Sequence, residues 1–198
     1  MRIMLYGSTV LTAAVEAELS CVVGHVPSIS PAFPGKMRSR VVTSDVPHDI
    51  KLSIQYDRRI VSTANAFNVH NGLLPEYGGV DILHHTLENG ATEQGLTFHA
   101  MSDEIDAGPI INKISYPVFL GDSVVDLYER MLAIAPGFVM MTLAILPNLD
   151  ISEIKSIAPV IYKRGAVKNI DRYERDGLAL RRYLSERELL NELVTQQP

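Results

Sequence analysis

Cysteine is nearly absent from this chain of 198 residues, in which Cys21 stands alone, and tryptophan is missing. A single thiol cannot form a disulfide within the chain, and no cluster of thiolate metal ligands is available. The N-terminal apolar run is too short for a signal peptide, and no later stretch reaches the ~20 apolar residues that span a bilayer. These absences predict a cytoplasmic protein without a membrane partner.

An excess of basic charge is also lacking, since the formal net charge is −5. Nucleic-acid binding usually requires a basic stripe, so a tRNA acceptor would need a local patch that the overall balance conceals. Apolar residues make up 46% and charged residues 21% of the chain, as is ordinary for a globular protein. We therefore expect residues 1–198 to form one domain, with roughly 70% of the unfolded chain's surface buried.

Hydrophobic patterns predict a strand–helix–strand opening and, further on, an antiparallel pair of strands. The expected strands are Ile3–Tyr6, Leu19–Val23, Ile50–Tyr56, Ala66–His70, Gly95–Met101 and Ile110–Val118. Two short helices are expected, at Leu11–Glu18 and Val80–Asn89. A longer, largely buried helix is expected from about Val124 to Leu146, with a kink or break at Pro136-Gly137. Residues 171–193 predict an amphipathic helical tail that is interrupted at Gly177. Residues 27–40, rich in Pro, Ser and Gly, predict a surface loop.

This order predicts an α/β, Rossmann-like fold with a mostly parallel central sheet, helices on both faces and a C-terminal antiparallel, hairpin-like pair. Such sheets bind ligands beyond the carboxyl ends of their strands. Asn68 and His70 lie two residues apart at the end of one expected strand, so their side chains should share a face. Asp106 follows in the polar connection between the last two strands.

An amide, an imidazole and a carboxylate are the groups that acyl transfer to an amine requires. Asn68 could donate to the developing oxyanion, His70 could move protons near neutral pH, and Asp106 could orient His70 or a water molecule. Each residue also has a purely structural interpretation, because a histidine near a strand end, a turn asparagine and the run Asp106–Pro109 can all serve turns. From spacing alone, both interpretations stay open.

Two other motifs give weaker indications of function, one for a metal site and one for a nucleotide site. Adjacent His84 and His85 would point about 100° apart on a helix and lack further ligands at a suitable spacing, so we expect no metal. The single break at Gly7-Ser8-Thr9 has no dinucleotide or P-loop fingerprint.

The run Asn68-Val69-His70-Asn71-Gly72-Leu73-Leu74-Pro75 is similar to the active-site pattern of the folate-dependent formyltransferase family, which reads Asn, any residue, His, two residues, Leu-Leu-Pro. Gly95–His99 and Glu104–Ile111 follow in the order that the family shows. The resemblance implies the family's fold, 10-formyltetrahydrofolate as cosubstrate, and roles for Asn68 as oxyanion donor, His70 as proton shuttle and Asp106 as orienting carboxylate.

The resemblance also implies two binding regions. The residues expected at the folate are Gln55, Tyr56, Ile60, Met101, Ser102, Asp103, Glu104 and Ile105. Those expected at the acceptor are Asn71, Gly72, Leu73 and Tyr77. Arg58-Arg59 beside the folate region is equally consistent with a solvated turn and with a position near a ligand's negative charge.

Three features depart from the family pattern. Many members carry Ser at the place of Gly72 and Arg at the place of Gly78, and the segment before Asn68 is short, as if one strand–helix unit were missing. The run from His70 to Tyr77 most resembles enzymes that formylate nucleotide-linked amino sugars. Aminoacyl or peptide-type amines rank second and methionyl-tRNA third, while a degenerate module that binds folate or a partner is the alternative outside catalysis. A homodimer is left open.

Overall fold

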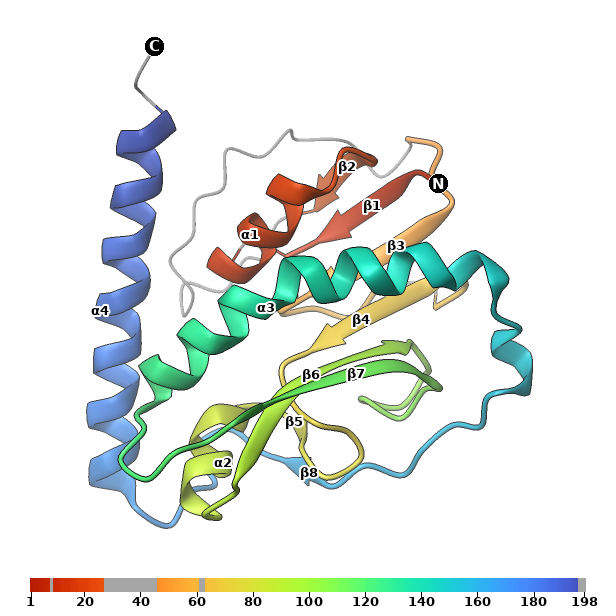
Figure 1. Ribbon diagram of the computed structural model, residues 1–198. Helices are drawn as coiled ribbons and strands as arrows, with labels where there is room; N and C mark the ends of the chain where they lie inside the picture. The colour runs from red at the N-terminus through yellow and green to blue at the C-terminus, as the bar shows by residue number, and fades with distance from the viewer. Residues whose placement is uncertain (8, 27–45, 61–62, 196–198) are drawn as a thin grey trace.

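A six-stranded sheet forms the centre of the computed structural model, which describes residues 1–7, 9–26, 46–60 and 63–195 (Figure 1). Its strands stand in the order β2-β1-β3-β4-β6-β7. They are β1 (Ile3–Tyr6), β2 (Val22–Val26), β3 (Ile50–Ile54), β4 (Ala66–His70), β6 (Glu93–Ala100) and β7 (Ile110–Pro117). The surface loop expected at residues 27–40 lies outside the described residues.

The first four of these strands run parallel, and β6 and β7 are antiparallel to their neighbours. The expected mixed α/β sheet with a hairpin-like pair is confirmed. Strand β2 begins three residues later than expected, because Leu19 still bonds the last turn of helix α1 (Val10–Glu18) through Glu16. The parallel arrangement places the carboxyl ends of β1, β3 and β4 at one edge, where a ligand is expected.

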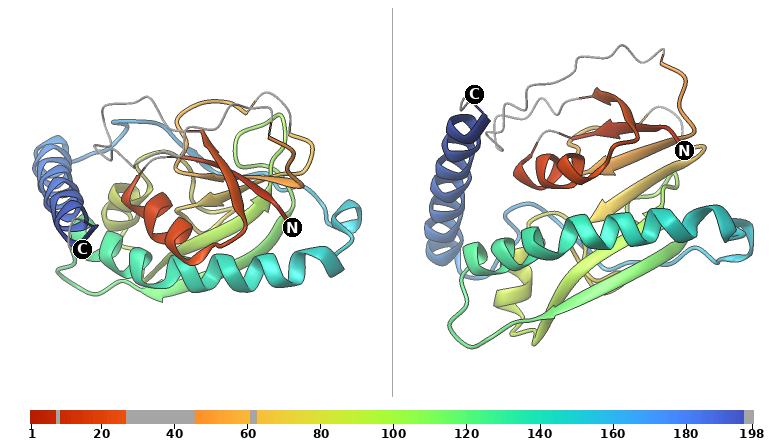
Figure 2. Two further views of the ribbon diagram at one scale, coloured as in Figure 1. Left: turned by 90° about the horizontal axis from the view of Figure 1, so that it is seen from above. Right: turned by 45° about the horizontal axis from the view of Figure 1, so that its top comes forward.

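Helices α1 and α3 (Val124–Ile145) lie on one face of the sheet, and α4 (Ile170–Thr195) packs on both of them at the side of the sheet (Figures 1 and 2). The expected layer of helices on the opposite face is not found among the described residues. The short helix α2 (Ile82–Glu88) lies below the sheet and contacts α3. A second, two-stranded sheet pairs β5 (Gly78–Gly79) with β8 (Ile161–Tyr162), and single 3-10 turns η1 (Leu146–Asn148) and η2 (Ile151–Glu153) follow α3.

Helix α3 begins at a capping box made by Ser123 and Asp126 and continues through Pro136 without the expected break. Proline removes one helix hydrogen bond, but core side chains on both sides of it, among them Met131 and Phe138, hold the helix against the sheet. The expectation of a largely buried helix is only half right, since Met140 is 44% and Met141 54% exposed.

The same helix corrects the expectation about long apolar segments. Val124–Asn148 is long and apolar enough to cross a membrane by length and composition, because the charged residues of α3 end at Arg130. Its inward face supplies much of the core of the sheet.

Helix α4 also runs uninterrupted through Gly177. Within the tail that was expected to be amphipathic, Leu184 is buried, whereas Leu178 is exposed. The tail is therefore one long helix that packs on α3 and α1 through part of its length.

Candidate active site

The carboxyl end of β4 positions the first two polar side chains. Strand β4 occupies the expected residues, Ala66–His70, and pairs in parallel with β3 and antiparallel with β6. Asn68 lies opposite His99, and His70 lies opposite Thr97. Because alternate side chains share a face, Asn68 and His70 project together beside the side chains of β6.

Asp106 completes the expected trio from the connection between β6 and β7. It adopts a left-handed conformation at φ 53°. Its Oδ2 lies 3.5 Å from His70 Nδ1 and accepts a hydrogen bond of 2.7 Å from the N–H of Gly79. The structure thus joins His70 and Asp106 directly.

A fourth residue, His99, belongs to this cluster although the sequence did not mark it as a site residue. The ring of His99 is buried and its Nε2 lies 3.6 Å from Asp106 Oδ1. Asn68 Nδ2 lies 3.2 Å from the same nitrogen, while His99 Nδ1 lies 2.9 Å from the carbonyl of Ala100. The signal that could have revealed His99 is its cross-strand pairing with Asn68.

Burial and neighbouring charges set the protonation states of His70 and Asp106. Burial lowers the pKa of His70, although the charge of Asp106 and the Tyr77 carbonyl both oppose that shift. For Asp106, burial alone would raise the pKa, but His99, His70 and the Gly79 N–H outweigh it and hold the pKa below its ordinary value. At neutral pH the site therefore presents a neutral imidazole, which can accept a proton, beside a carboxylate, which can stabilise the resulting cation.

The loop after β4 sets the orientation of the His70 ring. His70 Nε2 lies 2.6 Å from the carbonyl oxygen of Tyr77, a distance that requires a proton between them. A β-carbon at position 72 would stand 2.4 Å from that oxygen and 2.8 Å from the nitrogen. Gly72, the first departure from the family pattern, is therefore a steric requirement of this geometry.

Buried hydrogen bonds fix the same loop on the sheet. Thr97 Oγ1 donates to the Gly72 carbonyl at 2.7 Å and accepts from the Leu74 N–H at 3.1 Å. Lys113 Nζ donates to the Leu74 carbonyl at 2.9 Å. The three residues between His70 and Leu74 are thus held from β6 and β7.

Gly78, the second departure from the family pattern, lies on β5 beside Gly79. Gly79 has φ 94°, and a β-carbon there would stand 2.2 Å from the carbonyl oxygen of Tyr162 on β8. Its neighbour Gly78 packs closely against Pro159 and Ile161. Close pairing of β5 and β8 thus leaves no room for a side chain at Gly79, and it presents the Gly79 N–H to Asp106.

Two loops flank the trio at the positions expected for folate. Arg59 Nη2 donates to Asp103 Oδ1 at 3.0 Å, and this exposed ion pair bridges the loop after β3 and the loop after β6. The side chain of Arg59 is thus paired with a carboxylate of the chain itself. Within them Gln55 bonds Tyr128, Tyr56 packs edge-on against Tyr6, and Ser102 bonds the Glu104 carbonyl. Ile60 is buried, Met101 bonds Ala66 through its N–H, and Ile105 is exposed. The two loops are therefore adjacent.

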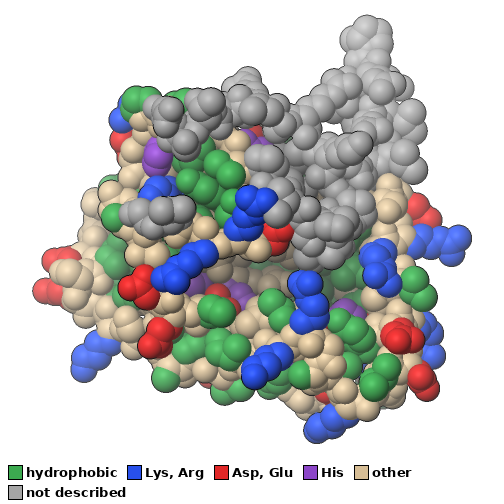
Figure 3. All heavy atoms as spheres, turned by 180° about the vertical axis from the view of Figure 1, so that it is seen from behind, with side chains coloured by type: hydrophobic (Ala, Val, Ile, Leu, Met, Phe, Trp, Pro, Cys, Tyr) green, Lys and Arg blue, Asp and Glu red, His purple; other side chains and the backbone are tan. Residues whose placement is uncertain are grey.

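The residues expected at the acceptor gather in the loop from β4 to β5. Asn71, Leu73 and Tyr77 are half-buried, and the ring of Tyr77 stacks on Tyr162 at 5.7 Å between centroids. Figure 3 shows, on the face opposite that of Figure 1, a hollow in which histidine and acidic side chains are visible, with Lys and Arg side chains around it. Among the residues that the structure describes, no group of His, Cys, Asp and Glu has a metal-binding arrangement.

Comparison with known proteins relates one segment of the chain to a known family. Residues 60–143 match the family model described as Formyl transferase, and this match includes Asn68, His70, His99 and Asp106. This segment, somewhat less than half of the chain, is similar to the formyltransferase family. Curated formyltransferases resemble the chain over short stretches: it is 44% identical over 64 residues to the phosphoribosylglycinamide formyltransferase of Escherichia coli, covering 32% of this chain and 30% of that protein.

It is also 30% identical over 114 residues to the methionyl-tRNA formyltransferase of Natranaerobius thermophilus, covering 54% of this chain and 36% of that protein. The matched parts thus span about a third of these relatives. Among solved structures, the N-formyltransferase of Helicobacter canadensis has a TM-score of 0.67 at 19% identity, covering 85% of this chain and 72% of that one. At that identity the likeness concerns the fold.

Proposed function

We propose that this protein transfers a formyl group from 10-formyltetrahydrofolate to a primary amine. The observation that carries the proposal is the joining of His70 and Asp106, at 3.5 Å, beside the Asn68–His99 pair at the carboxyl end of β4. The pKa values of His70 and Asp106 are both lowered, so a neutral imidazole lies beside an ionised carboxylate, and this pair suits proton transfer at neutral pH.

The reaction forms a bond between the amine nitrogen and the formyl carbon and breaks the bond from that carbon to N10 of the folate. Since His70 Nε2 holds the proton bonded to Tyr77, its Nδ1 is the atom that receives the amine's proton, next to Asp106 Oδ2. That proton then goes to the departing N10. The amide of Asn68 stabilises the oxyanion of the tetrahedral intermediate, a contact worth roughly 2.7–4 kcal/mol.

The folate is proposed to bind between the loop after β3 and the loop after β6. Support comes from their position on either side of the trio and from the link between Arg59 and Asp103. The Helicobacter canadensis structure was obtained with folinic acid, a folate, which supports a folate as cosubstrate.

For the acceptor we propose the amino group of a nucleotide-linked amino sugar. The same Helicobacter canadensis structure contains dTDP-3-aminofucose, and the sequence from His70 to Tyr77 favours this class. The curated relatives act by name on phosphoribosylglycinamide and methionyl-tRNA, so these two acceptors are the direct competitors.

The test is a single-turnover assay with 10-formyltetrahydrofolate and a panel of amines: dTDP-amino sugars, glycinamide ribonucleotide, an aminoacyl amine and methionyl-tRNA. We expect a formylated product with an amino sugar nucleotide and a thermal shift with the same compound. Product with another member of the panel would retain formyl transfer and reject the sugar. Folate binding without product from any amine would favour the degenerate module instead.

A further inference from the structure

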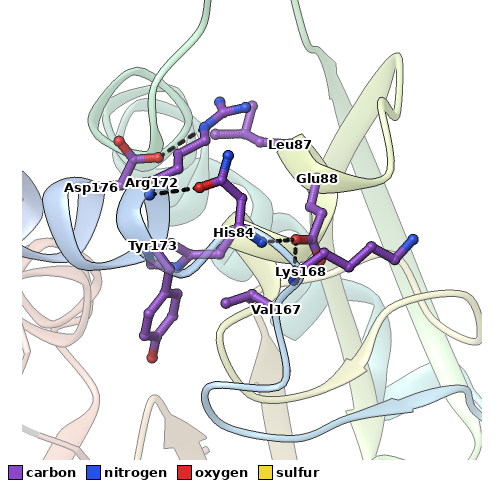
Figure 4. Close-up of a pocket in the computed structure, with 9 residues that line it drawn as sticks. His84, Leu87, Glu88, Val167, Lys168, Arg172, Tyr173 and Asp176 are labelled. Atoms are coloured by element: carbon purple, nitrogen blue, oxygen red, sulfur yellow. Dashed lines mark hydrogen bonds and ion pairs between the residues drawn. The ribbon is translucent and has the colours of Figure 1, made fainter.

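A pocket lies between α2 and the beginning of α4, and its residues are separate from the catalytic cluster. It has a volume of about 200 Å³. Its lining consists of His84, Leu87, Glu88, Val167, Lys168, Asn169, Arg172, Tyr173 and Asp176 (Figure 4). In Figure 4 the α2 residues His84 and Glu88 face the residues at the start of α4. None of the lining residues was expected at the folate or the acceptor.

The acidic groups of this pocket already accept hydrogen bonds within the chain. Glu88 Oε1 accepts from the backbone N–H groups of Lys168 and Asn169, the latter at 3.0 Å. Asp176 Oδ2 accepts from Arg172 Nε at 3.3 Å. The amides that precede α4 are therefore occupied by Glu88, so a ligand would have to be bound by side chains of the pocket.

Three donor groups are left without a partner among the described residues. Lys168 Nζ and the two terminal nitrogens of Arg172 have no acceptor in the described part of the chain, and the Nε2 of His84 is buried without a hydrogen bond. The rings of His84 and Tyr173 lie 4.6 Å apart, which holds the imidazole in place. Of these groups the His84 nitrogen is the buried one, since Lys168 is exposed and Arg172 half-buried, and an unsatisfied buried polar group is unusual and points to an absent partner. The groups that remain are thus one buried imidazole nitrogen and two cationic side chains.

We propose that this pocket binds a phosphate group, either free or as a small phosphate ester. Phosphate offers several acceptor oxygens, which suit the guanidinium fork and the ammonium group, and the volume is below that of pockets for drug-sized ligands. Tyr173 also donates to Asp81 at 2.8 Å, two residues after Gly79, so the pocket adjoins the strand that contacts Asp106. Binding here would be independent of formyl transfer.

The test uses NMR of the histidine rings in phosphate-free buffer, with the full chain and without folate or amine. The His84 resonance is assigned by its loss in His84→Gln. Inorganic phosphate and ribose 5-phosphate are titrated separately at constant ionic strength, with chloride as reference. We expect saturable shifts of His84, with His70 and His99 unaffected. The probe that binds more tightly distinguishes free phosphate from an ester.

Two matched variants complete the experiment. Lys168→Gln removes one unpaired cation while keeping the backbone N–H that Glu88 uses, and it should weaken phosphate binding at least about tenfold. Arg175→Gln removes an exposed cation of α4 that does not line the pocket and should leave binding unchanged. Equal binding by wild type and Lys168→Gln, or shifts that chloride reproduces, would overturn the proposal. Formyl transfer is measured separately, so its failure would not affect this result.

Discussion

A β-carbon on Gly72 would stand 2.8 Å from Nε2 of His70. That nitrogen is bonded to the Tyr77 carbonyl, which would stand 2.4 Å from the same carbon. The orientation of the proposed base thus depends on a residue without a side chain. A glycine that looked like a loss of function in the sequence is a condition for the observed geometry.

Gly72→Ser should therefore reduce turnover by about 10²-fold, because small displacements of a catalytic group are that costly. Steady-state kinetics with the active amine would measure it. Gly137→Ala is the matched control: a β-carbon there meets nothing, and alanine favours a helix by roughly 0.5–1 kcal/mol. Its rate should stay unchanged while its melting temperature rises; a Gly72→Ser enzyme as fast as wild type would contradict the steric account.

His99→Gln should move the acidic limb of the pH–rate profile to higher pH. His99 is one of the groups that lower the pKa of Asp106, so its removal lets burial raise that pKa. His99 also lowers the pKa of His70, so without it the imidazole becomes protonated, and activity falls, at a less acidic pH than in wild type. His48→Gln, in the segment before β3, serves as control. An unshifted limb in His99→Gln would remove His99 from the site's electrostatics.

Asp106→Asn should lower the pKa of His70 further. The charge of Asp106 raises that pKa and only partly offsets burial, so neutralising it leaves the desolvation cost of the imidazolium unopposed. NMR titration of the His70 ring in both proteins measures the change. A pKa that rises or stays constant in Asp106→Asn would mean that the two groups do not interact in solution.

Thr97→Val should destabilise the loop after β4. The buried hydroxyl makes two hydrogen bonds, to Gly72 and from Leu74, and their loss leaves both backbone groups unpaired. We expect a decrease of about 1–3 kcal/mol in the free energy of unfolding, measured by urea denaturation. Thr92→Val, at an exposed position just before β6, should change stability little. Equal stability of the two variants would speak against this anchoring role.

Strong local patterns made most of the sheet predictable. Strand β4 was predicted to the residue because its apolar alternation ends abruptly at the Gly72 loop. The start of β2 was missed, since Leu19 is apolar and yet completes the helix end. The break expected at Pro136 did not occur because tertiary packing on both sides of the proline outweighs its local cost.

The site could be predicted only in part for a similar reason. Asn68 and His70 share a strand, so their relation follows from alternation. The place of His99 depends on the register between β4 and β6, and the bond from Gly79 to Asp106 depends on the pairing of β5 with β8. Both are contacts between distant segments, which no local pattern contains.

The central claim is that Asn68 stabilises the charge that develops on the formyl oxygen. The direct measurement is the single-turnover rate of formyl transfer by Asn68→Ala, beside Asn89→Ala, which loses only an exposed hydrogen bond to Tyr162. We expect the first variant to be roughly 10²–10³-fold slower than wild type with its fold intact, and the second to match wild type. A full rate for Asn68→Ala would contradict the account.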